Sequence, residues 1–183
     1  MTTALLIVDL QNDYFAGGAM PLAGTEAAAR EAARLLARFR DDGRPVVHLQ
    51  HLSVRPGATF FLPGTPGAEI HPSLTPHEGE PVVEKNFPSG FRDTDLQARL
   101  DALGVDALLI CGAMSHMCVD STTRAAFDLG YRCSVAADAC ATRDLEFAGR
   151  KIAAADVHAA FMAALALPFA RVATTGELLE ALA

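Results

Sequence analysis

The hydrophobic pattern of the chain alternates between short apolar runs and longer amphipathic segments. Apolar runs predict six strands, at residues 4–9, 45–52, 81–85, 107–112, 131–139 and 169–173. Segments between several of these runs predict helices, at residues 25–40, 94–103, 115–129 and 146–165. Capping boxes are predicted where Thr94 precedes Gln97, at the start of the second helix, and where Thr174 precedes Glu177, at the start of a short final helix.

Strands that alternate with helices favour a parallel sheet with helices on both faces, because each crossover is right-handed and returns a helix to the sheet. We therefore expect an α/β fold, a three-layer doubly wound sheet of six mainly parallel strands. No internal repeat, linker or change in composition marks a domain boundary. Residues 1–183 are expected to form one domain.

The connection between the second and third predicted strands is long. Residues 53–80 are rich in Pro and Gly. A connection of this length inside a compact domain is uncommon and is usually functional. We expect this segment to cover a bound substrate.

Composition narrows the possible classes of function. With 51% hydrophobic and 20% charged residues, the chain can bury a sizeable core. The formal net charge of −7 argues against a nucleic-acid partner, which requires a concentrated surface of Lys and Arg. The chain starts without a basic region, and no apolar stretch approaches the length that spans a bilayer. We expect a cytoplasmic protein that binds neither nucleic acid nor membrane.

The cysteines form no C-x-x-C pair, and without a secretory signal they are expected to be free thiols. Cys111, Cys133 and Cys140 are interpreted as small buried apolar side chains. Cys118 differs because it follows a predicted strand and lies in the first turn of a predicted helix. It is therefore a candidate for chemistry.

Candidate reactive residues lie at the ends of three predicted strands. Asp9 ends the first strand, Lys85 ends the third, and Cys118 lies just past the fourth. In open α/β sheets, ligands bind beyond the carboxyl ends of the strands. Each residue alone has an ordinary structural explanation, as a turn acceptor, a solvated charge or a packed side chain. Together they form a chemically complete set.

The set predicts acyl transfer through a thioester. A helix N-terminus and a nearby lysine both stabilise a thiolate, so the pKa of Cys118 is predicted to lie below the free value of about 8.5. Asp9 acts in the opposite direction on this pKa. Asp9 can take the thiol proton and deliver it to a leaving amine, while Lys85 keeps the carboxylate ionised. Backbone N–H groups from Met114 to Cys118 can bind an oxyanion.

Three segments of the chain resemble the signatures of one family. They are VDLQNDYF at 8–15, EKNFPSGF at 84–91 and GAMSHMCVDSTTRAAFDLGY at 112–131. In order and spacing they resemble the isochorismatase-like cysteine hydrolases, within the nicotinamidase/isochorismatase superfamily. The resemblance implies that Asp9, Lys85 and Cys118 form the Asp-Lys-Cys catalytic triad of this family. The sequence SGF replaces the family's S-A-F, which is a small departure.

The resemblance has further implications. It implies the strand order 3-2-1-4-5-6, which places Asp9 and Cys118 side by side where the order reverses. It also implies a cis peptide bond between Ala113 and Met114, just before the turn whose Met114 and Cys118 N–H groups would bind the oxyanion. Members of the family are commonly dimers or larger, so a homodimer or higher homo-oligomer is expected.

The metal site of nicotinamidases has no counterpart in this sequence. GTPGAEIHPSL at 64–74 resembles a nicotinamidase segment, but the positions of the metal ligands hold His51, Ser53 and Phe60. One histidine cannot supply the converging carboxylate and imidazole ligands that such a cation needs. We expect no metal and no other cofactor, which disfavours nicotinamidase activity. His51 is interpreted as a hydrogen-bonded residue beside the pocket, and His48 is given no role.

Candidate substrate-binding residues come from the loops that should surround the catalytic end. The loop phenylalanines either line the pocket or pack into the core. His116 stands where nicotinamidases usually have Asp, and Gln11 either positions the site or completes a turn. The candidates are Gln11, Phe15, Phe60, Phe61, Phe91 and His116.

The favoured function is a metal-independent cysteine hydrolase that cleaves a C–N bond of a small amide or lactam. The SHMC sequence around Cys118 is similar to that of streptothricin-hydrolase-like members. A competing function is vinyl-ether hydrolysis of the isochorismatase type, whose enzymes lack the cysteine nucleophile. Three further functions stay open, namely nicotinamide hydrolysis, a thiol redox sensor and a catalytically silent binding protein. A redox sensor would need a resolving cysteine near Cys118, and Cys111, in the preceding strand, is expected to point away.

Overall fold

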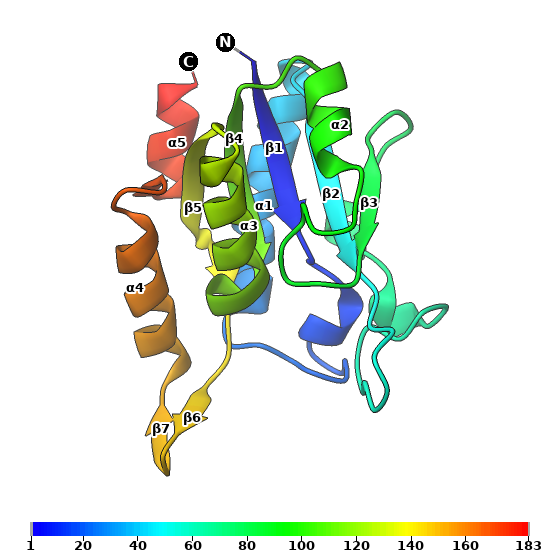
Figure 1. Ribbon diagram of the computed structural model, residues 1–183, viewed down its shortest axis with the longest axis vertical. Coiled ribbons are helices and arrows are strands. Elements are labelled where there is room, and N and C mark those ends of the chain that lie inside the picture. Colours follow the sequence, from blue (N-terminus) through cyan, green and yellow to red (C-terminus); the bar gives the residue numbers. More distant parts are fainter. Residues whose placement is uncertain (1, 183) are drawn as a thin grey trace.

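The computed structural model describes residues 2–182 and shows a central six-stranded sheet with helices on both faces (Figure 1). The strands are β1 (Thr3–Val8), β2 (Val46–His51), β3 (Val82–Lys85), β4 (Ala107–Ala113), β5 (Arg132–Ala141) and β8 (Arg171–Ala173). All neighbours are parallel, in the order β3-β2-β1-β4-β5-β8. The predicted α/β class and strand order are confirmed, with β8 as the sixth strand.

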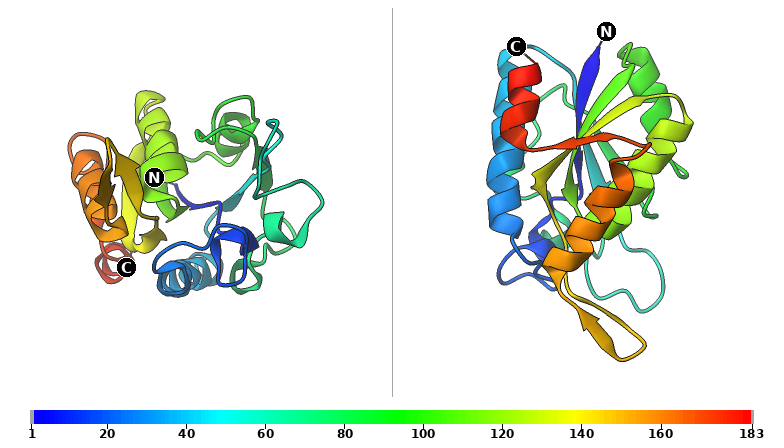
Figure 2. Two further views of the ribbon diagram at one scale, coloured as in Figure 1. Left: turned by 90° about the horizontal axis from the view of Figure 1, so that it is seen from below. Right: turned by 90° about the vertical axis from the view of Figure 1, so that its left-hand side faces the viewer.

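The helices form one layer on each face of the sheet. They are α1 (Thr25–Asp41), α2 (Leu96–Ala102), α3 (Asp120–Asp128), α4 (Ala154–Leu165) and α5 (Thr175–Ala181). Figure 2 shows α1 and α5 against one face and α2, α3 and α4 against the other. Short 3₁₀ turns occur at η1 (Asn12–Tyr14), η2 (Pro66–Ala68) and η3 (Pro72–Leu74). The arrangement is the predicted three-layer doubly wound sheet.

Side chains of β1 alternate between two hydrophobic clusters, one on each face of the sheet. Leu5 and Ile7 belong to the cluster under α1, whereas Ala4, Leu6 and Val8 belong to the other. All five are at most 2% exposed. A strand buried on both faces has a continuous apolar run, which explains the sequence ALLIV.

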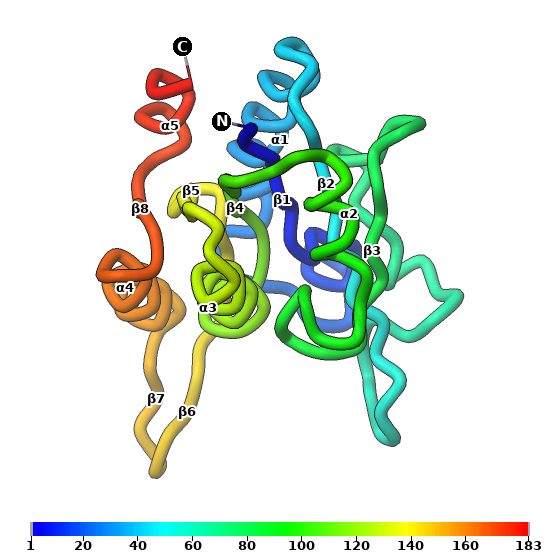
Figure 3. Tube along the Cα trace, turned by 45° about the horizontal axis from the view of Figure 1, so that its top comes forward, coloured from blue at the N-terminus to red at the C-terminus, as the bar shows by residue number. Residues whose placement is uncertain are grey.

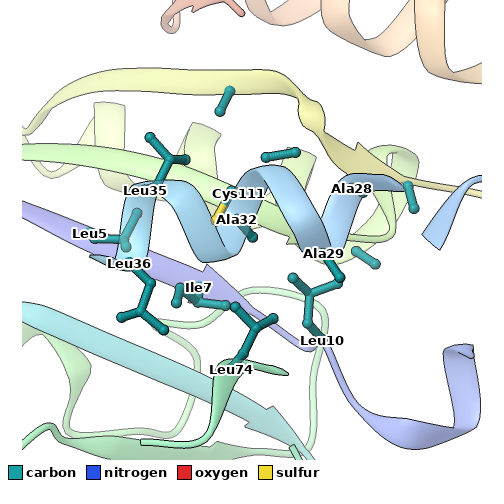
Figure 4. Close-up of a cluster of buried hydrophobic side chains, with 14 of the residues drawn as sticks. Leu5, Ile7, Leu10, Ala28, Ala29, Ala32, Leu35, Leu36, Leu74 and Cys111 are labelled. Atoms are coloured by element: carbon teal, nitrogen blue, oxygen red, sulfur yellow. The ribbon is translucent and has the colours of Figure 1, made fainter. Parts of the chain in front are cut away.

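Helix α1 presents small and aliphatic side chains to the sheet at intervals of three and four residues. Ala32, Leu35 and Leu36 lie over β1 and β4 in Figure 4, where Cys111 of β4 lies beneath the helix. Each fully buried leucine contributes about 1.5–3 kcal/mol relative to an exposed one. This packing holds β1 and β4 together at the centre of the sheet.

The helix predicted over 146–165 is wrong in its first part. β6 (Leu145–Phe147) and β7 (Arg150–Ile152) pair as an antiparallel hairpin, and α4 follows it. Ala148 and Gly149, between the strands, both have positive φ, the geometry of a tight two-residue hairpin turn. The hairpin projects beyond the carboxyl end of the sheet (Figure 3).

Other predicted helix starts are partly corrected. Thr94 does not form the predicted capping box; its hydroxyl donates to the Gly90 carbonyl oxygen at 2.6 Å and accepts from the Leu96 N–H at 3.3 Å. The helix predicted from residue 115 begins as a π-helical turn, η4 (Ser115–Val119), before α3. The predicted capping box of Thr174 and Glu177 is present at the start of α5.

The long connection over 53–80 contains η2 and η3 but no strand of the central sheet. Its first part extends beyond the carboxyl end of β2 (Figure 1). Within residues 2–182, no helix has the length and apolarity needed to cross a membrane.

Candidate active site

The ends of three strands bring Asp9, Lys85 and Cys118 to one edge of the sheet. Asp9 follows β1, Lys85 ends β3, and Cys118 lies in η4 after β4. β1 pairs with β2 on one side and β4 on the other, so the direction of winding reverses beside it. Gly112 permits the close approach of β4, because a Cβ there would lie 2.0 Å from the Val8 carbonyl oxygen.

A buried ion pair connects Asp9 and Lys85. The Lys85 Nζ donates to Asp9 Oδ2 at 2.7 Å, and both side chains are fully shielded from solvent. Nζ also lies 3.1 Å from His51 Nδ1 and donates to the Phe87 carbonyl oxygen at 3.2 Å. Asp9 Oδ1 is buried and has no hydrogen-bond partner within residues 2–182. The lysine therefore orients the carboxylate through one oxygen and leaves the other free.

The charge state of Lys85 follows from its surroundings. Burial has the largest single effect and lowers the pKa of its ammonium, but the charges and hydrogen bonds of Asp9 and Cys118 together raise it more, and the net shift is upward. Lys85 is therefore a permanent cation near neutral pH. Its charge compensates that of the carboxylate, without which a buried Asp9 would be costly.

Cys118 presents its thiol to the same cluster. Its Sγ, an Asp9 carboxylate oxygen and a His51 ring nitrogen all lie within 4.8 Å of one another. Burial raises the pKa of this thiol, Asp9 raises it further, and Lys85 lowers it less. The predicted pKa below the free value is therefore wrong. The sequence did not reveal that the Cys118 side chain is only 6% exposed.

The turn that carries Cys118 is tied to neighbouring elements. The Ala113–Met114 peptide bond, just before the turn, is cis. The Ser115 hydroxyl donates to the Ala141 carbonyl oxygen at 3.3 Å, and its Oγ lies 2.8 Å from His158 Nδ1 on α4. These bonds hold the turn against β5 and α4, and so fix the backbone beside the thiol.

A cavity of about 360 Å³ lies beside Cys118, a volume that suits a small molecule. Most of its wall is apolar. The apolar residues of the wall are Val54, Phe60, Phe87, Pro88, Met114 and Met117. The polar residues, apart from Cys118, are Tyr14, His51, Ser53, Arg55 and Asn86.

Only part of the expected substrate-binding set lines this cavity. Phe60 forms part of the wall. Phe61 lies behind the wall, 1% exposed, with its ring centroid 4.5 Å from that of Tyr14. Gln11 is buried, donates to the His51 carbonyl oxygen at 2.9 Å and accepts from the His51 N–H at 2.7 Å. Phe61 and Gln11 therefore support wall residues instead of lining the cavity.

The remaining candidates are not among the cavity-lining residues within residues 2–182, so their expected contact with substrate is not supported. Phe15 stacks on His71 with ring centroids 3.7 Å apart, and Phe91 stacks on Tyr131 at 6.0 Å. His116 directs Nδ1 to a threonine hydroxyl that follows β5, at 2.6 Å. Each aromatic ring has found a stacking or hydrogen-bond partner outside the site.

Some wall residues were not among the candidates derived from the sequence. Tyr14, Asn86 and Met117 line the cavity, and all three lie within the signature segments at 8–15, 84–91 and 112–131. Membership of these segments is the signal that could have identified them. Arg55, on the loop after β2, carried no such signal.

The residues do not fit a metal ion of the nicotinamidase kind. Asp9, His51 and Cys118 offer ligand atoms close to one another. However, the Lys85 ammonium lies 2.7 Å from Asp9 and 3.1 Å from His51, so a dication would face a fixed positive charge. Phe60, at a nicotinamidase ligand position, has no ligand atom.

Known proteins match most of this chain. A family model described as "Isochorismatase domain" matches residues 3–177. The chain is 49% identical to the isochorismatase family protein YddQ of Bacillus subtilis, over 98% of the chain and 100% of that protein. It is 44% identical to a streptothricin hydrolase of Streptomyces noursei, over 78% of the chain and 50% of that protein. It is 34% identical to the maleamate amidohydrolase of Pseudomonas putida, over 70% and 67% of the two chains.

The fold also matches a solved structure. An isochorismatase hydrolase from Oleispira antarctica has a TM-score of 0.95 and 56% identity, over 98% of this chain and 96% of that chain. The likeness therefore extends over the whole sheet and both helical layers, and is not confined to the signature segments.

Proposed function

The chain belongs to the isochorismatase family of hydrolases, and from that premise we propose a metal-independent cysteine hydrolase that cleaves the C–N bond of a small amide or lactam. The similarity to a maleamate amidohydrolase supports amide hydrolysis. The proposal rests mainly on one observation. The Cys118 thiol lies in the cavity wall, close to an Asp9 carboxylate that has one buried oxygen without a partner in the described part of the chain.

The first half-reaction forms a thioester. Asp9 Oδ1 accepts the thiol proton as the Cys118 sulfur attacks the amide carbonyl carbon. The backbone N–H groups of Met114 and Cys118 stabilise the charge that develops on the carbonyl oxygen. The protonated Asp9 then gives its proton to the amide nitrogen, and the C–N bond breaks. An open-chain amide gives the acyl-enzyme and releases ammonia or an amine, whereas a lactam gives an acyl-enzyme whose acyl group still carries the new amine.

The second half-reaction hydrolyses the thioester. Asp9 takes a proton from a water molecule whose oxygen attacks the thioester carbonyl carbon. The C–S bond breaks, the carboxylic acid leaves, and the proton returns to the sulfur of Cys118. Lys85 stays an ammonium throughout and holds the Asp9 carboxylate in place. The raised pKa of the thiol agrees with a mechanism in which the proton moves to Asp9 during attack.

The position of Cys111 disfavours a redox function in which it acts as the resolving cysteine. Cys111 packs in the cluster under α1, whereas Cys118 packs in the cluster on the opposite face of the sheet. A disulfide requires Cα atoms within about 7 Å and side chains that point toward each other. Cys111 therefore cannot act as the resolving cysteine without rearrangement of the sheet.

A screen of small amides and lactams tests the proposal. We expect release of ammonia or amine, together with a transient mass increase of the intact protein equal to the acyl group. Cys118→Ala should abolish both signals. Cys133→Ala changes a buried thiol outside the cavity and should leave both signals in place. Cleavage of a vinyl ether such as isochorismate, with every amide untouched, would overturn the proposal.

Two finer statements belong to the same proposal. We propose that the protein acts in the cytoplasm. We also propose that it assembles as a homodimer or higher homo-oligomer, as its family resemblance implies. Sedimentation velocity tests the assembly. A single species of monomer mass at micromolar concentration would contradict it.

A further inference from the structure

His51 is held at the cavity by contacts on both its backbone and its ring. It is the last residue of β2, and its N–H and carbonyl oxygen both bond to the Gln11 side chain, at 2.7 and 2.9 Å. Its ring lies near that of Phe61, with centroids 6.0 Å apart. The ring is therefore positioned before a substrate arrives.

The contact with Lys85 determines which ring nitrogen carries the proton. An ammonium has three N–H donors and no acceptor. Nζ meets Asp9 Oδ2, the Phe87 carbonyl oxygen and His51 Nδ1, the last at 3.1 Å. His51 Nδ1 must therefore be unprotonated, which leaves the proton of the neutral ring on Nε2. Burial, Lys85 and Arg55 lower the pKa of His51, against a smaller opposite effect of Asp9, so the ring is neutral near pH 7.

The second ring nitrogen, Nε2, is open to the cavity. No group within residues 2–182 forms a hydrogen bond with Nε2. The buried polar atoms without a partner are Asp9 Oδ1 and His48 Nδ1 in this range, so His51 Nε2 is accessible. His51 is half-buried and lines the cavity together with Cys118. The open side of the ring is therefore the side that faces the cavity.

We propose that His51 determines substrate specificity by donating a hydrogen bond from Nε2 to a second oxygen of the substrate, near the scissile amide. This inference rests on the proposed function. The substrates are then small amides that also carry an ether, carbonyl or carboxylate oxygen. Because Nδ1 accepts a hydrogen bond from Lys85, the proton of the ring stays on Nε2, and Nε2 cannot accept a hydrogen bond. Amides that present an N–H group to Nε2 are therefore disfavoured.

Two substitutions separate the roles of the two ring nitrogens. His51→Asn keeps a side-chain oxygen that can accept from Lys85, but removes the donor at the Nε2 position. His51→Gln is one methylene longer and returns an N–H group toward the Nε2 position. Asp9, Lys85 and Cys118 are unchanged in both variants. A thermal unfolding measurement on each variant tests whether it is folded.

The readout is a set of amide pairs that differ by an ether oxygen in place of a methylene. Methoxyacetamide with butyramide, and 3-methoxypropanamide with pentanamide, place the oxygen at successive positions. In each pair, the measured ratio is kcat/KM of the ether amide divided by kcat/KM of the amide with the methylene. For the pair whose ether oxygen reaches Nε2, His51→Asn is expected to lower this ratio about fivefold. His51→Gln is expected to keep the ratio within about twofold of the wild-type value. Activation of the carbonyl by the ether oxygen is the same in all variants and cancels.

The outcomes separate this inference from the proposed function. If amides are cleaved but no ratio depends on His51, the inference is overturned and the proposed function stands. If no amide is cleaved, the proposed function fails and the inference fails with it.

A spectroscopic measurement tests the tautomer without any substrate. A long-range ¹H–¹⁵N correlation spectrum at pH 7 is expected to show His51 protonated on Nε2 alone. The spectrum of His51→Asn assigns the signal by its loss. A proton on Nδ1, or on both nitrogens, would overturn the inference.

Discussion

Two polar clusters each include a histidine of β2 and contain the same kinds of side chain. The active-site cluster is Asp9, His51 and Lys85, and the Glu80 cluster is Arg40, His48 and Glu80. Each contains a histidine, a carboxylate and a cation, and each has an ion pair at 2.7 Å. The two differ in what lies next to them, because only the active-site cluster adjoins the cavity and the Cys118 thiol.

In the Glu80 cluster, both oxygens of the carboxylate are used. Arg40 donates to one oxygen at 2.7 Å and to the other at 2.8 Å, and the second oxygen also meets His48 Nε2 and the His77 N–H. Burial raises the pKa of Glu80, but Arg40, the His77 N–H and His48 together lower it to about 2. The cluster ties the end of α1 to the segment before β3.

The comparison shows that residue types alone do not identify a reactive site. Among residues 2–182, Asp9 has a free oxygen beside a thiol, whereas both oxygens of Glu80 have partners. The Glu80 cluster also contains an atom without a partner in this range, His48 Nδ1, but His48 is 1% exposed and does not line the cavity. A free proton acceptor becomes a candidate general base when a cavity and a nucleophile adjoin it.

Matched substitutions of the two carboxylates should give the largest contrast. Asp9→Asn removes the proposed general base, and we expect the kcat for a cleaved amide to fall by about 10²–10⁴. Glu80→Gln should leave kcat within about twofold, since it changes no group at the cavity. Amine release measured on both variants makes the comparison. Equal losses of turnover in the two variants would contradict the conclusion that Asp9 acts in the reaction and Glu80 does not.

The stability of the Glu80 cluster should depend on pH. The pKa of Glu80 is lower in the folded chain, about 2, than the ordinary 4.5, so its stabilising effect is complete above pH 4.5 and disappears toward pH 2. We expect Glu80→Gln to lower the free energy of unfolding by about 1–3 kcal/mol at pH 7, a difference that shrinks as the pH falls through this window.

Urea unfolding of wild type and Glu80→Gln across this pH range measures the difference. Asp95→Asn is the matched control, because it removes a carboxylate from an exposed ion pair with Arg99. Such a pair is screened by solvent, so this variant should change stability less. If the difference in the free energy of unfolding between Glu80→Gln and wild type stays the same at low pH, the charge of Glu80 is not the source of the stabilisation.

Much of this arrangement could be predicted from the sequence. The apolar runs located the strands, and parallel strands place their carboxyl ends on one edge, which brings Asp9, Lys85 and Cys118 together. Directions of side chains could not be predicted, because they depend on partners distant in sequence. Phe15 turns to His71, and His51 lies between a glutamine of the loop after β1 and a lysine of β3.

The hairpin of β6 and β7 shows a second limit. Its strands are only three residues long, too short for an apolar alternation to stand out. Phe147 contributed an apolar position to the predicted helix, but its side chain is 77% exposed and does not pack in a core. Its apolar character was therefore misleading. Gly149, which has a positive φ in the turn, was the one local signal against a helix.

The thiol of Cys118 offers a smaller and more local test of the active-site cluster. Burial and the charge of Asp9 raise its pKa, so removal of that charge should lower it. We expect the rate of alkylation by iodoacetamide to rise at a lower pH in Asp9→Asn than in wild type. Glu80→Gln serves as the control and should keep the wild-type profile. An unchanged profile in Asp9→Asn would show that Asp9 does not act on the thiol.

Removal of metal ions should have the smallest effect of all. In the active-site cluster the Lys85 ammonium lies against both Asp9 and His51, where it compensates the carboxylate as a metal ion would. Phe60, at a nicotinamidase ligand position, contributes only apolar surface to the cavity. Dialysis against a strong chelator should therefore leave kcat and KM unchanged for a cleaved amide. If activity is lost and Zn²⁺, Mn²⁺ or Fe²⁺ restores it, a metal ion binds at the site despite the Lys85 ammonium. Nicotinamidase chemistry would then again be a candidate function.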